Sequence, residues 1–474
     1  MRVRNLTRTK GTDATLVVGL EGVGPWMVGA CGAHGARTPH LDRLAASSDI
    51  CLHSFVDSVA LEQQLLGMWT GRHACAGGLP EQTLRSTPHE PSSPTDPGNP
   101  RSRTETDRGS SGPALDTLWH QMAAEEKSGT LVTDVPEVAE AAERAGCSMA
   151  ILVQTASPPT QAAEEAAQCV CMELFRVAAE MIADGYGGLL WVHSKGLYHP
   201  WDAPLALRHA MIDPDDPPPP AGIHPPGELP DYRPRWLAGN AASSQFDPDL
   251  VLGWNQVAAA QTAVLDQGIG LLRAALEARG EEHSWNWLIH SLGQIPLGEH
   301  GALGSPLTVP YLEHLRMLAI VRPAAQQLAR FRQAILQSPD FYSVLAAWML
   351  AAHRNRPPHS TPAAHGAAAE WPACWGNYPL ADDSPTHWLA VTLDAKQGGP
   401  GWIRSPAWSV RRDSRQVQLF VQPDDRWEVG DVADLEADIA SSLIRAGDAF
   451  IDAAKNHRRL EAGDEMSALI NQMR

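Results

Sequence analysis

The chain has 474 residues and a formal net charge of -18 at pH 7, from 37 Lys and Arg against 55 Asp and Glu. Hydrophobic residues make up 43% of it, enough for a globular protein, and the length exceeds what one core usually serves. The acidic balance argues against non-specific nucleic-acid binding, because phosphate contacts need Lys and Arg. No apolar run approaches the ~20 residues of a membrane-spanning helix, which argues against a membrane protein.

Cysteine use and the start of the chain bear on location. Seven cysteines, scattered and odd in number, do not suggest a disulfide framework. The first residues are basic, but the apolar run at 15–20 is too short for a signal-peptide core and is more typical of a strand. We therefore expect a cytoplasmic protein.

Short β-branched or Leu-rich runs alternate with amphipathic segments through most of the chain. In chain order, we predict a strand at 15–18, helices at 38–46, 58–69 and 115–124, a strand at 130–133, a helix at 137–145, a strand at 150–154, a long helix at 161–183, a strand at 187–193, a long helix at 250–279, strands at 285–290 and 315–321, and a helix at 339–352. This alternation predicts an α/β fold with a mainly parallel sheet covered on both faces. Polar or Pro-rich stretches at 81–113 and 213–235 are predicted to be flexible insertions.

The pattern changes near residue 355. A linker rich in Pro, Ala and His at 354–372 precedes predicted strands at 388–393, 407–411 and 417–421 and a helix at 434–456. These elements predict a small antiparallel sheet with a C-terminal helix. We therefore divide the chain into an α/β domain at 1–355 and a C-terminal α+β subdomain at 356–474.

Late tryptophans stand out in this subdomain. They are Trp371, Trp375, Trp388, Trp402, Trp408 and Trp427. Two roles fit them: stacking on sugars through their aromatic faces, or filling the core of the small sheet.

Six segments carry familiar short motifs. They are Thr-Pro-His-Leu-Asp-Arg-Leu-Ala at 38–45, Thr-Gly-Arg at 70–72, Trp-Val-His at 191–193, Tyr-His-Pro-Trp-Asp-Ala-Pro at 198–204, Leu-Gly-Glu-His-Gly at 297–301 and Trp-Glu-Val-Gly-Asp-Val at 427–432. The ordered set resembles the sulfatase family of the alkaline phosphatase-like superfamily, in a divergent bacterial-type form. The resemblance implies a mixed, mostly parallel sheet flanked by helices, with a small C-terminal antiparallel sheet and helix.

The metal-binding positions of that family are altered here. The family holds a divalent cation with carboxylates and an Asn or His, which suit a hard ion such as calcium. The first ligand pair aligns with Glu21 and Gly22, so Glu21 is a candidate metal ligand; the alternative is an ordinary polar residue at a strand end. The second pair aligns with Leu292 and Gly293, which offer no side-chain oxygen. The resemblance therefore implies a degenerate site without a cofactor.

The nucleophile is lost as well. The family uses a Cys or Ser that becomes formylglycine, with an Arg four residues later. These positions align with Leu61 and Leu65, so the helix is kept without its reactive groups. Ser58 lies nearby, but it lacks the Pro and Arg of the motif, and we expect it to N-cap the helix.

Polar residues survive in other segments. The family's Lys-x-His motif is absent from 128–134. His193, Lys195 and His199 form the richest remaining polar group and are candidates for catalysis or for anion binding. The alternative is a surface loop that follows a buried strand.

The retained Gly-Glu-His-Gly turn supplies two more candidates. Glu299 is a candidate metal ligand, and His300 is a candidate catalytic group. The alternative is that the turn persists because it shapes the backbone.

The lost positions favour a sulfatase-fold protein without catalysis, which binds an anionic small molecule or a sulfated sugar or acts as a scaffold. A fold alone does not fix a function, so the site must decide. The first alternative is an active sulfuric or phosphoric ester hydrolase that holds calcium or another divalent cation with Glu21, His193, His199, Glu299 and His300. The second is an unrelated α/β enzyme, which a different strand order would reveal.

Overall fold

The computed structural model describes residues 14–35, 37–76, 116–155, 157–229, 247–305, 310–350, 389–394, 399–412 and 416–456. The predicted insertion at 81–113, the last six residues (230–235) of that at 213–235 and the predicted linker at 354–372 lie outside these residues, as do Trp371, Trp375 and Trp388. The predicted domain boundary at residue 355 also falls outside them.

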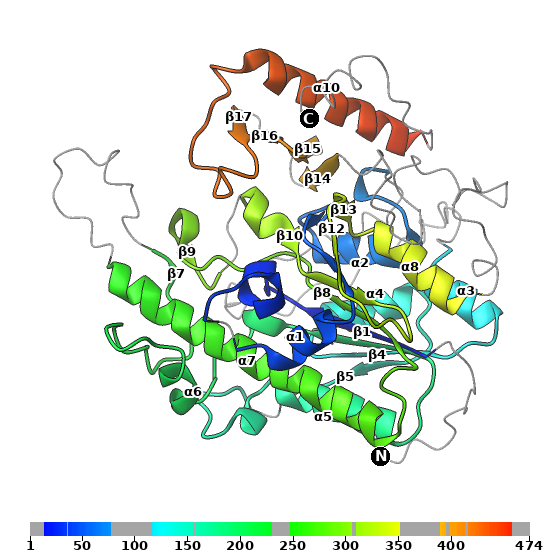
Figure 1. Ribbon diagram of the computed structural model, residues 1–474. Helices are drawn as coiled ribbons and strands as arrows, with labels where there is room; N and C mark the ends of the chain where they lie inside the picture. The colour runs from blue at the N-terminus through cyan, green and yellow to red at the C-terminus, as the bar shows by residue number, and fades with distance from the viewer. Residues whose placement is uncertain are drawn as a thin grey trace, which may run out of the picture.

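An eight-stranded sheet forms the centre of the molecule (Figure 1). In spatial order its strands are β12 (Arg330–Arg332), β2 (Asp49–Cys51), β11 (Ala319–Arg322), β8 (Asn286–His290), β1 (Thr15–Leu20), β6 (Leu189–Ser194), β4 (Gly129–Thr133) and β5 (Ala150–Leu152). The strands from β8 to β5 run parallel, and β11 is antiparallel to β8. The predicted mixed, mostly parallel sheet is confirmed.

Helices cover both faces of this sheet, as the alternation of side chains along β1 shows. Leu16 and Val18 belong to one hydrophobic cluster, and Val17 between them belongs to another. The first cluster includes α1 (Pro39–Ala45), α5 (Met172–Ala183) and α7 (Pro248–Ala278); the second includes α2 (Leu61–Thr70), α3 (Leu118–Ala124), α4 (Pro136–Arg144) and α8 (Asp340–Met349). None of the described helices combines the length and the apolar composition of a membrane span.

The C-terminal residues form a four-stranded antiparallel sheet covered by α10 (Ala437–Lys455). Its strands, in order, are β14 (Ala390–Asp394), β15 (Gly399–Arg404), β16 (Trp408–Arg412) and β17 (Val417–Val421). The predicted small sheet with its helix is confirmed. The sequence analysis missed β15, because its Gly-Pro-Gly start is atypical of a strand.

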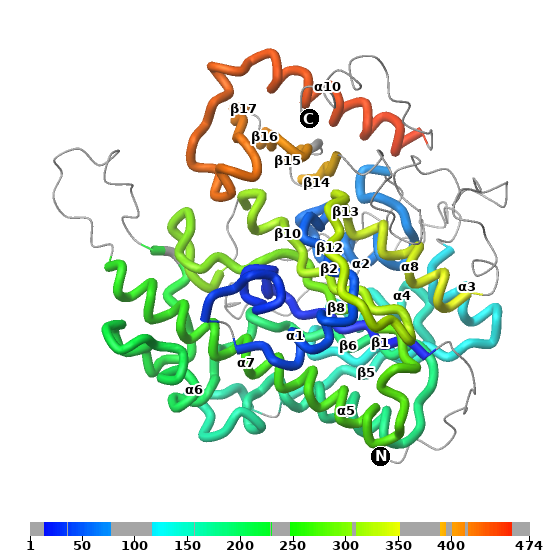
Figure 2. Tube along the Cα trace, in the orientation of Figure 1, coloured from blue at the N-terminus to red at the C-terminus, as the bar shows by residue number. Residues whose placement is uncertain are grey.

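Buried hydrogen bonds join this C-terminal sheet to the α/β body. A three-stranded sheet lies at the junction, in the order β10 (Arg316–Met317), β3 (Ser54–Phe55) and β13 (Leu336–Gln337). The Gln337 side-chain amide donates to the carbonyls of Val56 and Val391, and its oxygen accepts from the Val391 backbone N–H. Figure 2 shows β13 and β14 as neighbours at this junction.

The helix predicted at 161–183 is wrong over its first half. Residues 166–168 form a short 3-10 turn, and α5 begins only at Met172. The Asp202 side chain accepts a hydrogen bond from the Val170 N–H, and its backbone carbonyl accepts one from the Ala163 N–H, each at 2.8 Å. The segment therefore bonds to the loop after β6 instead of to its own backbone.

The strand predicted at 315–321 is divided into β10 and β11. Leu318 lies between them, and its backbone N–H donates to the Ser291 hydroxyl at 2.8 Å. Its carbonyl accepts from the Ser291 N–H at 3.0 Å. This exchange turns the chain from the central sheet to the junction sheet.

Asp57 places a buried carboxyl at the same junction. One of its oxygens accepts a hydrogen bond from the Ala74 backbone N–H at 2.8 Å. Burial raises the pKa of Asp57 to about 7. Burial, with a smaller contribution from Asp57, also raises the pKa of Asp340 well above its ordinary value.

This raised pKa gives a stability prediction. Between about pH 4 and pH 7 the unfolded chain ionises at Asp57 while the folded chain keeps the proton, so this group lowers stability as pH rises. We expect Asp57→Asn to gain stability relative to the wild type over that range, reaching on the order of 4 kcal/mol, with no further gain above pH 8. Urea unfolding at several pH values measures the difference, and a pH-independent difference would contradict the assignment.

Candidate site at the carboxyl edge of the sheet

Three parallel strands bring polar side chains to one edge of the sheet, where ligands gather in open α/β folds. Glu21 directly follows β1, His193 lies near the end of β6, and His290 ends β8. Gly19 of β1 pairs with both histidines across the sheet. A Cβ atom at this position would lie 2.6 Å from His193 Nδ1 and 3.1 Å from His290 Cε1, so only glycine leaves room for both rings.

The Glu21 carboxylate and the His193 imidazole form a buried pair. Oε1 and Nε2 are 3.1 Å apart, but they lack the alignment of a hydrogen bond, and the two side chains are 7% and 0% exposed. Burial, with a smaller effect of His193, lowers the pKa of His290 to about 3, so His290 is neutral at physiological pH. Burial and the nearby Glu21 carboxylate raise the pKa of Tyr198.

A second polar pair lies one strand farther along. Nε2 of His199 is 2.6 Å from Oδ2 of Asp134, which follows β4. The other Asp134 oxygen accepts a hydrogen bond from the Lys195 backbone N–H at 2.6 Å. Asp134 therefore fixes the loop that carries His199 and leaves the Lys195 side chain exposed.

The structure thus divides the predicted polar group of His193, Lys195 and His199. His193 pairs with Glu21, whereas His199 pairs with Asp134. Sequence reasoning missed Asp134 and His290 as members of the site. Their positions at strand ends, beside β6 and β1, are the signal that would have found them.

Solved structures match this chain in fold. No protein-family model and no curated protein sequence matches it. A 2-O GAG sulfatase superposes with a TM-score of 0.62 at 13% identity, over 94% of this chain and 93% of that one. The phosphonate monoester hydrolase of Agrobacterium radiobacter gives a TM-score of 0.62 at 13% identity, over 94% and 96%.

The chain has the sulfatase fold. A third match, a crystal structure in complex with the oligosaccharide k-i-k-neocarrahexaose, covers 97% of both chains with a TM-score of 0.58 and 14% identity. The resemblance noted in the sequence and the predicted fold class are both confirmed at the level of fold. The positions aligned with the sulfatase motifs can now be placed in the structure.

Apolar packing occupies those aligned positions. Leu65 and Leu292 are 0% and 6% exposed and belong to one hydrophobic cluster, and the partly buried Leu61 packs against it. Gly293 adopts a left-handed conformation with φ of 102°, and a Cβ there would lie 2.9 Å from the His314 carbonyl oxygen. The side chains of Leu61, Leu65 and Leu292 therefore pack in or against the hydrophobic core.

The residues at this edge do not fit the family's divalent cation. Such an ion takes six or more oxygen ligands, and Glu21 is the one carboxylate at the aligned positions, already paired with His193. The Gln294 amide packs against Gly24, where its oxygen fills the place of a Cβ. Across the described part of the chain, no group of three His, Cys, Asp or Glu side chains is placed to hold a metal ion.

Ser58 does not cap the helix as predicted. The N-cap residue is Ala60, and α2 begins at Leu61. The Ser58 hydroxyl accepts from the Ala60 N–H at 3.1 Å and donates to the Gln63 side chain at 2.5 Å. Ser58 thus orders the turn before the helix.

The Gly-Glu-His-Gly turn directs its polar side chains to local partners. The Glu299 carboxylate accepts a hydrogen bond from the Leu297 N–H at 2.5 Å, and burial raises its pKa. His300 has φ of 54° and stacks on Tyr311 with ring centroids 3.3 Å apart. Burial lowers the pKa of His300 to about 4. These contacts favour the backbone-shaping role of the turn.

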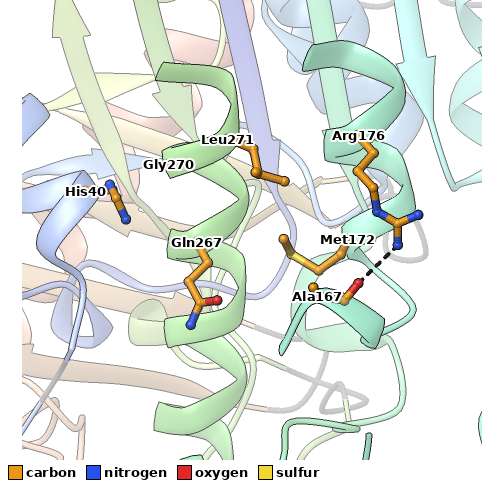
Figure 3. A pocket seen from close by; sticks show the side chains of 7 residues that line it. All are labelled: His40, Ala167, Met172, Arg176, Gln267, Gly270 and Leu271. Carbon is orange, nitrogen blue, oxygen red and sulfur yellow. Dashed lines mark hydrogen bonds between the residues drawn. The ribbon is translucent and has the colours of Figure 1, made fainter. Parts of the chain in front are cut away.

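A separate surface groove of about 400 Å³ lies between α1, α5 and α7 (Figure 3). It is lined by His40, Ala167, Met172, Arg176, Gln267, Gly270 and Leu271. Arg176 donates a hydrogen bond to the Ala167 carbonyl at 3.1 Å. His40 of the 38–45 motif lines this groove, whereas Glu21, Leu61, Leu65, Leu292 and Gly293 do not.

The packing of Leu292 gives a test of the site. We expect Leu292→Asp to destabilise the protein by about 3 kcal/mol, because it buries an unpaired carboxylate among apolar side chains. Leu292→Met conserves the volume and is the control, with an expected cost below about 1.5 kcal/mol. Urea unfolding with and without calcium measures both. A stable Leu292→Asp protein that calcium stabilises further would show an open ligand site instead.

Proposed function

We propose that this sulfatase-fold protein has lost ester hydrolysis and binds an anionic ligand of the sulfated-sugar class. The packing of Leu61, Leu65 and Leu292 into the protein core is the observation that supports the loss of hydrolysis. A leucine side chain supplies neither a nucleophile nor a charge for the transition state, and both are needed for rapid transfer of a sulfuryl group. The proposed loss therefore affects both the nucleophile position, Leu61, and a metal-ligand position, Leu292.

Anion binding is supported by the groups that remain. The Lys195 side chain is an exposed cation on the loop that follows β6. The Asp134 contacts hold this loop to the carboxyl edge of the sheet. In a chain with a net charge of -18, a local cation at this edge is the feature that would attract an anion.

The alternative, a hydrolase with displaced metal ligands, needs at least three of the candidate side chains around one ion. The contacts of these side chains argue against it. Glu21 pairs with His193, His199 pairs with Asp134, and Glu299 accepts from a neighbouring backbone N–H.

Two further parts of the proposal concern location and domains. A cytoplasmic location is supported by the described cysteines, which are all buried and are not joined to one another by disulfides. The division into an α/β domain at 1–355 and a C-terminal subdomain at 356–474 is supported by the separate hydrophobic cluster that packs α10 on its sheet.

The loss of hydrolysis is tested by assay. We expect purified protein to cleave neither 4-nitrophenyl sulfate nor a phosphonate monoester above the rate of a heat-treated sample, with calcium or manganese added. The reason is that leucine stands at the aligned nucleophile position and that Glu21 is the one carboxylate at the aligned metal positions. Turnover that a chelator abolishes and that Glu21→Gln removes would establish the hydrolase alternative.

A further inference from the structure

Four arginines gather where the α/β body meets the C-terminal sheet. This arginine cluster consists of Arg316 of β10, Arg404 of β15, Arg411 of β16 and Arg426, which follows β17. Arg316 and Arg404 are only 5% and 2% exposed, whereas Arg411 and Arg426 are half-buried. The cluster therefore extends from the interior to the surface.

Aromatic rings hold the two outer arginines in place. The Arg426 guanidinium lies over the rings of Trp26 and Trp427, 4.3 Å and 4.0 Å from their centroids. Arg411 lies 4.3 Å from the centroid of Tyr311, which in turn stacks on His300. Cation–π contacts of this kind orient a guanidinium without neutralising its charge.

Carboxylates compensate only part of this charge. Glu313 reaches the Nε atoms of Arg316 and Arg426 at 3.5 Å and 3.7 Å, which are long ion-pair distances. Glu428 accepts hydrogen bonds from the Leu312 N–H at 2.9 Å and from a serine hydroxyl at 2.7 Å. Four arginines thus face two carboxylates, one of which is held by neutral donors.

Several guanidinium donors in the cluster have no acceptor. Nε of Arg404, and both Nε and Nη1 of Arg411, are buried without a hydrogen-bond partner among the described residues. Burial, with a further effect of the neighbouring Arg316, lowers the pKa of Arg404 to about 9. Buried donors almost always find an acceptor, either in the protein or in a bound molecule.

We infer that the arginine cluster binds an oxoanion, either free or as the sulfate group of a sugar, at the junction of the α/β body and the C-terminal sheet. Guanidinium groups match the planar pairs of oxygens that sulfate and carboxylate present. The site adjoins the carboxyl edge. Trp26 lies in the loop after β1, and Leu318, two residues after Arg316, exchanges hydrogen bonds with Ser291, which directly follows β8. The inference rests on the proposed binding role and names the residues that would carry it.

Calorimetric titration with sodium sulfate and with a heparin-derived disulfated disaccharide tests the inference. We expect Arg411→Gln and Arg426→Gln each to weaken binding about tenfold or more, because each removes charge-assisted hydrogen bonds. Arg412→Gln is the matched control. It makes the same charge change one residue along β16, where the side chain faces Asp448 of α10 at 3.3 Å. Its expected affinity stays within about twofold of the wild type.

The outcomes separate the site from the proposed function. Loss of sulfate binding in the two cluster variants assigns the site to a free oxoanion, and loss of disaccharide binding alone assigns it to a sulfated sugar. Wild-type affinity in both, with binding lost in Lys195→Ala, overturns the cluster but keeps the binding role. Equal weakening in Arg412→Gln indicates general attraction and also overturns the cluster. A wild-type protein that binds neither probe overturns the binding role itself. Arg426→Lys replaces Arg426→Gln if that variant does not fold.

Discussion

Leu292, just after β8, and Leu65 of α2 belong to one buried hydrophobic cluster on a face of the central sheet. Each fully buried leucine contributes roughly 1.5–3 kcal/mol of hydrophobic stabilisation, so α2 is fastened to the sheet at the place where a sulfatase would carry its chemistry. A cation here would displace these side chains and lose that stabilisation. The apolar packing that stabilises the fold therefore argues against an ion at these positions.

The polar groups left at this edge interact with one another. Glu21 and His193 form a buried pair, and Asp134 holds both His199 and the backbone of Lys195. Asp134 thus occupies His199, whereas Glu21 and His193 face each other without an aligned hydrogen bond. Lys195 is an exposed cation, and carboxylates compensate the charge of the arginine cluster only in part. Local cationic surface on an acidic protein favours selective binding of anions, since the rest of the molecule repels them.

The sequence predicts six of the eight strands of the central sheet, because strands buried on both faces appear as short apolar runs between amphipathic helices. The short strands β2 and β12 were not predicted. The helix predicted over residues 161–171 is wrong. There the Val170 N–H donates to the Asp202 side chain instead of to a backbone carbonyl of a helix. The leucines at the aligned positions 61, 65 and 292 are visible in the residue types alone. The partners of His193 and His199 are not, because strand register decides which side chains meet. The arginine cluster escaped sequence reasoning for a similar reason, since its members come from four separate segments.

The central claim is that the carboxyl edge of this sulfatase fold is packed as core and holds no catalytic metal. A crystal structure of the protein grown in calcium chloride tests this most directly. We expect Leu292 to pack with Leu65, and Glu21 to face His193, with no ion between Glu21 and Gln294. A calcium ion bound there by Glu21 and at least two further protein oxygens would contradict the claim.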